Sequence, residues 1–331
     1  MLEAGSTKCV EVLGSYRVNV ARIRRQAAAT TSIALLTVTA TLSATAVAVE
    51  TDMWFSTVPG AGGAPLNVME TGNPSGSEIL FIHGMGMSYL SFLPQYQSDL
   101  AKEFRIVAMD LRGHGGSAKP WRREDVQPSA VWADDIAAVI AAKNLKKPVI
   151  VAWSFGGFVT ADYLRKFGHE GIAGINFVGT LAGLVKQAPP VGSMTPEQMK
   201  RRAAMQTSGN MIDSLQIVAE TTRLFEFSGI TPEYRELMFN MGVMVPPYFR
   251  RAFAGANLDH QDVTPTLQGL PILVTMGEFD IAQSPEAYAS LKGALSWASF
   301  SEYSATGHLP FAHHPERFNN ELAEFVHTAN R

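Results

Sequence analysis

Short apolar runs alternate along the chain with longer stretches in which apolar residues recur every three or four positions. Runs rich in β-branched residues lie at 79–83, 105–110, 148–153, 175–180 and 271–276. Four of these runs are almost continuously apolar, as strands buried on both faces of a parallel sheet are. The helical periodicity lies at 91–103, 129–144, 155–167, 284–292 and 315–329. This alternation predicts a doubly wound, mostly parallel α/β sheet, with antiparallel edge strands at 53–57 and 66–70.

The strand pattern disappears between residues 186 and 266. Proline and glycine there separate helical patterns at 195–206, 211–227 and 231–241. We therefore predict a helical cap at 186–266, inserted into a core that comprises residues 49–185 and 267–331. The cap is rich in methionine, at positions Met194, Met199, Met205, Met211, Met238, Met241 and Met244. Methionine adapts to irregular apolar space, so these residues either line a ligand pocket or pack the cap onto the core.

The first 48 residues are predicted to be a signal peptide or an N-terminal anchor. Four arginines, Arg17, Arg22, Arg24 and Arg25, precede an uncharged and moderately apolar stretch at 27–49. Two A-x-A sites follow, at 44–46 and 46–48, which completes the order of a secretory signal. Cleavage near Ala48 would give an exported, periplasmic or secreted protein without stable membrane insertion. The alternative is a protein that stays anchored to the membrane through residues 27–49.

Composition narrows the classes of partner and chemistry. The chain is 46% hydrophobic and 17% charged, which is typical of a folded globular protein. Its formal charge of −3, with no later run of Lys and Arg, argues against nucleic acid as a partner. The single cysteine, Cys9, lies inside the predicted signal, so the mature chain would have neither a disulfide nor a thiol nucleophile.

The heptapeptide VAWSFGG at 151–157 is the strongest local signal for chemistry. It follows a predicted buried strand and opens a predicted helix, which is the context of a nucleophile elbow. Such a turn holds its serine in a strained conformation and requires small residues two positions before and after it. Gly156 meets this requirement, and Ala152 stands where glycine is usual. We predict that Ser154 is a nucleophile; the alternative is an ordinary helix N-cap serine.

A loop that follows the first buried strand is predicted to complete an oxyanion hole. Acyl transfer passes through an oxyanion that needs two preorganised donors, and backbone N–H groups serve this purpose. One donor would be the N–H of Phe155, directly after the nucleophile, and the other the N–H of Met85 in the loop HGMG at 83–86. His83 is interpreted as structural support. Gly84, Met85 and Trp153 are predicted to line the substrate pocket.

A serine nucleophile needs a base and an orienting acid. Asp280 follows the strand that ends at Met276, and His308 lies in a loop before the last helix. The chain order Ser154, Asp280, His308 is the order expected when the serine lies in a nucleophile elbow. Glu278 is the alternative acid, and His260, inside the predicted cap, is the histidine least excluded as an alternative base.

Five segments together resemble one family of proteins. They are FIHGMGMS, MDLRGHGGSAKP, VAWSFGGFV, MGEFD and GHLPFAHHPERFNNELAEFV. These segments resemble the α/β-hydrolase family, and most closely its capped esterase, perhydrolase and carbon–carbon hydrolase branches. The resemblance runs from residue 53 to the end, with the insertion aligning only as a cap. It implies an eight-stranded sheet with the active site under a helical cap, and a structural turn at 110–117.

The predicted function is hydrolysis of an ester of a small to medium apolar substrate through an acyl-enzyme. Carbon–carbon bond hydrolysis, lactone opening and perhydrolysis use the same triad and remain alternatives, because fold does not decide between them. A non-catalytic ligand receptor is the alternative of another class. We predict no metal and no cofactor, because the sequence has neither H-E-x-x-H nor G-x-G-x-x-G after the first strand.

Overall fold

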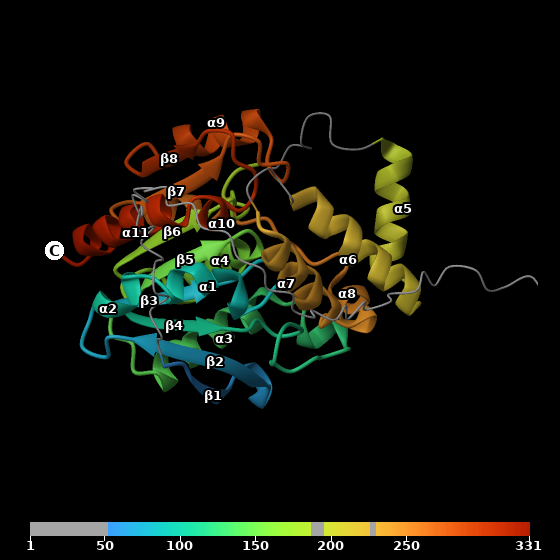
Figure 1. The fold of residues 1–331 in the computed structure, drawn as a ribbon, viewed down its shortest axis with the longest axis horizontal. Coiled ribbons are helices and arrows are strands. Elements are labelled where there is room, and N and C mark those ends of the chain that lie inside the picture. The colour runs from blue at the N-terminus through green and yellow to red at the C-terminus, as the bar shows by residue number, and fades with distance from the viewer. Residues whose placement is uncertain (1–51, 187–194, 226–229) are drawn as a thin grey trace, which may run out of the picture. The chain divides into compact units, whose positions relative to one another are not determined.

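The computed structural model of the protein describes residues 52–186, 195–225 and 230–331. Its centre is an eight-stranded sheet with the strand order β1-β2-β4-β3-β5-β6-β7-β8 (Figure 1). The strands are β1 Trp54–Pro59, β2 Pro65–Gly72, β3 Glu78–Ile82, β4 Arg105–Met109, β5 Val149–Trp153, β6 Gly174–Val178, β7 Ile272–Gly277 and β8 Ser299–Tyr303. β1 and β2 pair antiparallel, β2 joins β4 antiparallel, and every other pairing is parallel. The predicted mostly parallel eight-stranded sheet is therefore confirmed.

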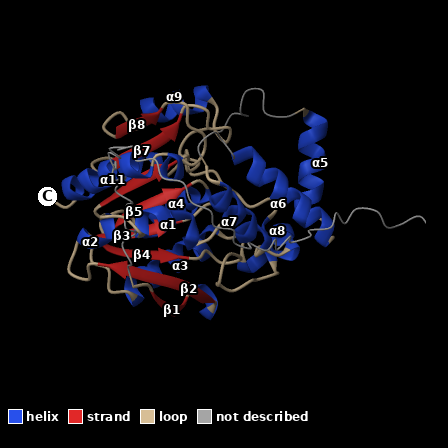
Figure 2. Cartoon of the chain, viewed as in Figure 1, coloured by secondary structure: helices blue, strands red, loops and turns tan. Residues whose placement is uncertain are grey.

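Helices cover both faces of the sheet (Figure 2). On one face lie α3 Ser129–Ala142, α4 Phe155–Phe167 and α9 Pro285–Ala294, and on the other lie α1 Leu93–Tyr96, α2 Leu100–Glu103, α10 Pro310–His313 and α11 Pro315–Ala329. Strand β5 shows why two layers are needed. Ile150 and Ala152 belong to one apolar cluster, whereas Val149, Val151 and Trp153 belong to the other. Because alternate side chains of a strand point to opposite faces, an apolar run buries both.

Two predictions about individual elements were wrong or incomplete. The single helix predicted at 91–103 is broken into η2 Tyr89–Phe92, α1 and α2. Ser98 stands at the break, where its hydroxyl donates to the carbonyl of Gln95 and accepts from the N–H of Leu100. Such local side-chain bonds compete with continued helix. The edge strand β8 was not recognised from its pattern, because its residues are mostly polar and only Tyr303 is fully buried.

In the described residues between β6 and β7 lie four α-helices. They are α5 Pro196–Thr207, α6 Met211–Phe225, α7 Pro232–Val243 and α8 Pro247–Phe253. Three of them match the helical patterns predicted there, and α8 is additional. They gather beyond the carboxyl ends of the parallel strands (Figure 1). Met238 and Met241 of α7 belong to one core cluster, and Phe249 and Ala252 of α8 belong to the other. The insertion therefore reaches the cores on both faces of the sheet.

The described residues contain three further short 3-10 helices. They are η1 Ala61–Gly63, η3 Arg123–Asp125 and η4 Thr264–Leu267. The predicted signal or anchor at 1–48 lies outside the described residues, and it stays a prediction, as do the predicted bounds of the cap. In the part of the chain that the structure describes, every helix is too short or too polar to cross a membrane.

Candidate active site

The turn between β5 and α4 holds Ser154 in an unusual backbone conformation. Its φ is +53° and its ψ is −117°, a region that non-glycine residues rarely occupy. The Ser154 N–H donates to the carbonyl of Val178 at 2.9 Å, which ties the turn to the end of β6. A side chain at Gly156 would place its Cβ only 2.4 Å from the carbonyl oxygen of Ile82. The close approach of β3 therefore explains why glycine is required two positions after the serine.

The base and acid predicted from chain order are in direct contact. His308 Nδ1 lies 2.8 Å from Oδ1 and 2.9 Å from Oδ2 of Asp280. His308 is 1% exposed and Asp280 is 8% exposed. Asp280 follows β7 and also accepts a hydrogen bond from the N–H of Ala282 at 2.9 Å, which fixes the carboxylate. Because Nδ1 faces the carboxylate, a neutral His308 carries its proton there and keeps Nε2 as the basic nitrogen.

Neighbouring loops bring this pair to the nucleophile turn. The indole N–H of Trp153 donates to the carbonyl of His308 at 3.0 Å. A Cβ added to Gly84 would lie 3.0 Å from the Cβ of Ser154, so the loop after β3 lies against the turn. A Cβ added to Gly179, which has a φ of +55°, would lie 3.1 Å from Asp280 Oδ2 and 3.2 Å from His308 Nδ1. The predicted residues therefore converge at the carboxyl end of the sheet.

The loop predicted to complete an oxyanion hole is held by a buried histidine. His83 Nδ1 bonds the carbonyl of Gly84 at 2.8 Å, and His83 Nε2 accepts from the N–H of Leu111 at 3.0 Å. Burial lowers the pKa of His83, which keeps the ring neutral and able to accept. These are the contacts of a structural histidine. Met85, two residues later, is partly buried against the core.

The second predicted donor stands at the start of a helix. Phe155 is the first residue of α4, and first-turn N–H groups of a helix have no partner within it. Its ring is 6% exposed and packs edge-on against Trp132 and Phe253. Phe253 belongs to α8, so the residue after Ser154 also contacts the insertion.

Trp153 occupies a different place from the one predicted. It was expected to line the substrate pocket, but it is 1% exposed and its indole points to the loop of His308. The apolar side chains of β5 alternate, and Trp153 falls on the face that packs against α10 and α11. Pattern alone could not separate a pocket wall from a core residue.

The alternative residues have other partners. His260 Nε2 bonds Oδ1 of Asp162, a residue of α4, at 2.7 Å, and both residues are buried. The Oε2 atom of Glu278 accepts from the N–H of Ala305 at 2.8 Å, so Glu278 supports the loop before His308. In the segment 110–117, Asp110 accepts from the N–H groups of Tyr89 and Gly116, which is consistent with a structural turn.

Two supporting contacts were not found from the sequence. His314 Nε2 lies 2.8 Å from the hydroxyl of Thr306, two residues before His308, and links this loop to the start of α11. Gly179 directly follows β6 and leaves room for the Asp280–His308 pair. A glycine at the carboxyl end of a buried strand is a signal for close approach, although it does not say what approaches.

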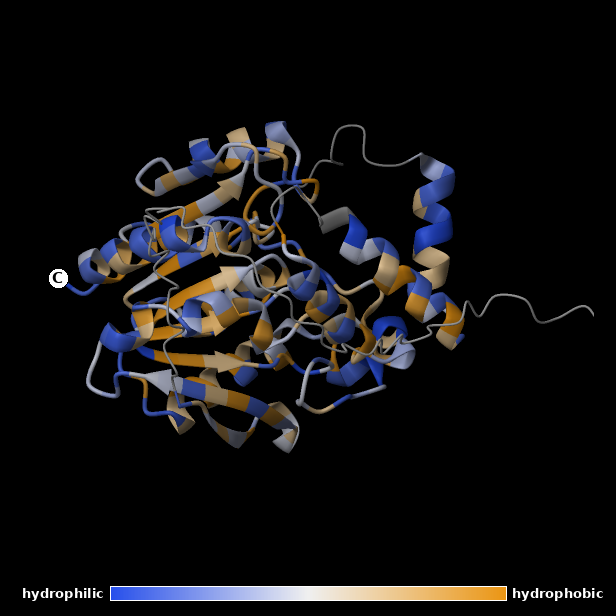
Figure 3. Ribbon diagram, in the orientation of Figure 1, coloured by the Kyte–Doolittle hydropathy of each residue, from blue (hydrophilic) through white to orange (hydrophobic). Residues whose placement is uncertain are grey.

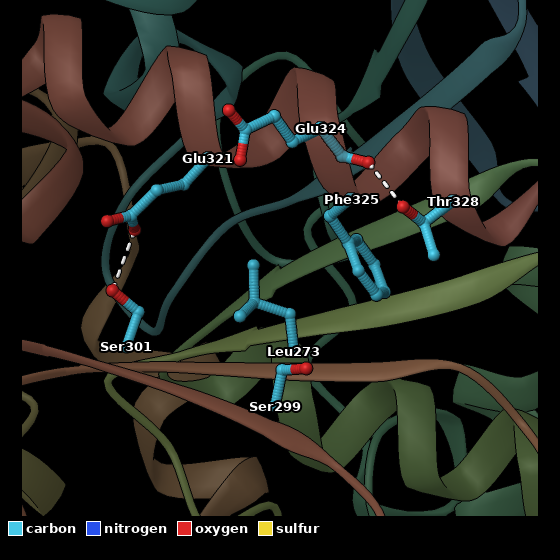
Figure 4. Close-up of a pocket in the computed structure, with 7 residues that line it drawn as sticks. All are labelled: Leu273, Ser299, Ser301, Glu321, Glu324, Phe325 and Thr328. Atoms are coloured by element: carbon cyan, nitrogen blue, oxygen red, sulfur yellow. Dashed lines mark hydrogen bonds between the residues drawn. The ribbon is translucent and has the colours of Figure 1, made fainter.

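A cleft elsewhere on the surface carries none of the predicted residues. It has a volume of about 270 Å³ and is lined by Leu273, Ser299, Ser301, Glu321, Glu324, Phe325 and Thr328 (Figure 4). Leu273 and Ser299 lie at the start of β7 and β8, within two residues of where these strands begin, whereas Asp280 and His308 follow the ends of the strands. Glu321, in this cleft, accepts from Ser301 and Tyr303. Across the described ranges, no group of three or more His, Cys, Asp or Glu side chains is arranged to hold a metal ion.

The family follows from a match over most of the chain. The sequence model of the alpha/beta hydrolase fold matches residues 79–315, well over half of the protein. Together with the eight-stranded sheet, this match shows that the chain belongs to the α/β hydrolase fold family.

Named relatives include esterases. The AB hydrolase superfamily protein YisY of Bacillus subtilis is 26% identical over 259 residues, which cover 76% of this chain and 91% of YisY. The bifunctional esterase/perhydrolase DCH of Acinetobacter calcoaceticus is 33% identical over 113 residues, 34% of this chain and 37% of DCH. The esterase RhEst1 from Rhodococcus sp. ECU1013 has a similar structure, with a TM-score of 0.72 and 26% identity, covering 83% of this chain and 99% of RhEst1.

Proposed function

We propose that this protein is a serine ester hydrolase that works through an acyl-enzyme. Ser154 is the nucleophile, His308 the general base and Asp280 the orienting acid. The observation that carries the proposal is the contact of His308 Nδ1 with both carboxylate oxygens of Asp280, beside a serine held at positive φ in a strand-to-helix turn. This combination of strained serine and paired imidazole is the geometry that serine acyl transfer requires.

The chemistry follows from these positions. His308 Nε2 takes the proton of Ser154 as its oxygen attacks the ester carbonyl, and Asp280 stabilises the imidazolium that forms. The backbone N–H groups of Phe155 and Met85 stabilise the oxyanion, each by about 3 kcal/mol. His308 then protonates the leaving alcohol. Water activated by the same imidazole releases the acid from the acyl-enzyme.

The proposed substrate is an ester with a small to medium apolar group. Aromatic side chains beside the nucleophile support this class, because Phe155 packs against Phe253 of the insertion at a ring distance of 5.1 Å. The name of RhEst1 describes an esterase and that of DCH an esterase that is also a perhydrolase. Perhydrolysis on the same serine is therefore the second candidate, in which hydrogen peroxide replaces water in releasing the acyl group.

Hydrolysis of p-nitrophenyl esters with acyl chains of two to twelve carbons tests the proposal. We expect Ser154→Ala to lower kcat/KM at least about a thousand-fold, since removing the nucleophile removes the covalent path. Ser290→Ala, which changes an exposed serine of α9, is the matched control and should keep full activity. Labelling by a fluorophosphonate should likewise disappear only in Ser154→Ala. Activity that persists in a folded Ser154→Ala protein would refute the mechanism.

Perhydrolysis has its own readout. Incubation with a short carboxylic acid and hydrogen peroxide should yield a peracid, which oxidises bromide in a colorimetric assay. Peracid formation that depends on Ser154 would support the second candidate in addition to ester hydrolysis.

A further inference from the structure

Trp153 connects the nucleophile turn with the loop of the base. It is the last residue of β5 and directly precedes Ser154. Its side chain is 1% exposed, and its indole N–H donates to the backbone carbonyl of His308 at 3.0 Å. The bond joins residues that lie 155 positions apart in the chain. One buried side chain therefore reaches from the strand that carries the nucleophile to the residue that carries the imidazole.

The ring of Trp153 is held on several sides. It packs edge-on against Phe311 at a centroid distance of 5.1 Å and against Phe92 at 6.3 Å. The imidazole of His308 lies at 5.6 Å from the indole. A Cβ added to Gly84 would come within 3.3 Å of the indole carbons, so the loop predicted to form the oxyanion hole also contacts this ring. A ring confined in this way presents its N–H in a fixed direction.

The loop that carries His308 needs such a fixed partner. Residues 304–309 form neither helix nor strand, so specific bonds determine their path. Glu278 holds the N–H of Ala305, and the carbonyl of Thr306 accepts from the N–H of Phe279. The bond from Trp153 acts on His308 itself. His308 is buried, and a buried carbonyl without a donor is costly, so the indole determines how this peptide group is oriented.

We propose that Trp153 is a positioning residue for the base, which acts through its indole N–H on the backbone of His308. This inference rests on the proposed function. Rotation of the His308 peptide group would swing the imidazole away from the line between Asp280 and Ser154. Catalysis is sensitive to such movements, because a displacement of about 1 Å costs on the order of a hundred-fold in rate. Trp153 does not contact the substrate in this role.

The test removes the donor and keeps an aromatic side chain. Trp153→Phe lacks the N–H, and replacement of Trp153 by benzothienylalanine keeps the bicyclic shape with sulfur in place of N–H. For p-nitrophenyl ester hydrolysis we expect kcat to fall about 10- to 100-fold with KM changed less than about twofold. The pH dependence of kcat should also change, because a loosened Asp280–His308 pair stabilises the imidazolium less. A merely structural role would leave the pH profile unchanged.

Trp297→Phe is the matched control. The indole N–H of Trp297 donates to the carbonyl of Leu270 at 3.3 Å, away from the site, so its loss should leave kcat and the pH profile unchanged. If Trp153→Phe fails to fold, the benzothienylalanine protein preserves the packing and answers the question. Wild-type kcat and pH profile in a folded Trp153 variant would overturn the proposal. So would a raised KM with unchanged kcat, which would indicate a pocket wall. Failure of the proposed function has a separate sign, namely activity that survives in Ser154→Ala.

Discussion

The loops at the carboxyl ends of the strands and the helices inserted between β6 and β7 are held in different ways. The loops are bonded through their backbones to one another and to neighbouring strands. Gly179 donates to the carbonyl of Thr275 in β7, and Phe279 donates to the carbonyl of Thr306 in the loop before His308. The inserted helices depend instead on buried side chains. This difference indicates that the sheet and its loops fix the positions of the candidate residues, whereas the inserted helices pack onto the core through their side chains.

The insertion is itself uneven. In α7 the hydroxyl of Tyr234 donates to the carbonyl of Ser91 at 2.6 Å, and Met238 is 1% exposed within a core cluster. In α5 the buried residue is Met205, which belongs to neither core cluster, and the helices that α5 contacts most are α6 and α8. In Figure 3 α5, at the edge of the molecule, carries many hydrophilic residues, whereas the central strands are mostly apolar. Helices α7 and α8 are thus part of the core, and α5 lies outside it.

The largest loss of activity should come from a substitution in the loops at the carboxyl ends of the strands. Asp280→Asn keeps the size of the side chain but removes the charge and allows the wrong tautomer of His308, so we expect kcat to fall by about 10⁴-fold. Thermal unfolding should change little, because the asparagine oxygen can still accept from the N–H of Ala282. Steady-state kinetics and a melting curve on the same sample check both statements. Glu278→Gln, which alters the neighbouring acid on the same loop, should cost less than about tenfold. The reverse ranking of the two variants would move the acid to Glu278.

Within the insertion, truncation of methionine should distinguish α7 from α5. Met238→Ala removes a side chain from the core cluster and should lower the free energy of unfolding by about 2–5 kcal/mol. Met205→Ala on α5 makes the same chemical change outside the core clusters, so its cost should stay below about 2 kcal/mol. Urea denaturation of both proteins gives the comparison. Equal losses would mean that α5 is as well anchored as α7.

Acid should lower the free energy of unfolding through two buried histidines, His83 and His114, in the loops that follow β3 and β4. Burial lowers the pKa of His83 and lowers that of His114 well below its usual value, so both rings are neutral in the folded protein. Unfolding then takes up protons as the pH falls below about 6.5, the value of a free imidazole. The stabilising contribution is therefore present above this pH and is lost as the pH falls toward the folded-state values. In this range, each histidine lowers the free energy of unfolding by up to about 1.4 kcal/mol for every pH unit by which the pH falls.

Denaturation curves between pH 7.5 and pH 5 measure this slope. Protonation of His83 also turns Nε2 from an acceptor into a donor and breaks its bond with the N–H of Leu111. His83→Gln should consequently show a shallower dependence on pH than the wild-type protein. Stability that does not change over this range would contradict the assignment of neutral buried rings.

The sequence by itself determined the class of fold and the chain order of the candidate residues. Buried parallel strands need continuous apolar runs, and a strained turn needs glycine at Gly156, so both leave local marks that pattern analysis recognises. The polar edge strand β8 left no such mark, because an edge strand buries few of its residues. The break at Ser98 was missed as well, since its side-chain bonds compete with a helix that periodicity favours.

Only the tertiary structure decided which side chains meet. The contact between Asp280 and His308, the partnership of His260 with Asp162 and the bond from Trp153 to His308 join residues that are distant in sequence. Trp153 shows the reason most clearly. Its position before Ser154 is evident in the sequence, but its role depends on which face of β5 it occupies and which loop folds over that face. Strand register and loop packing set both, and neither is encoded in a local pattern.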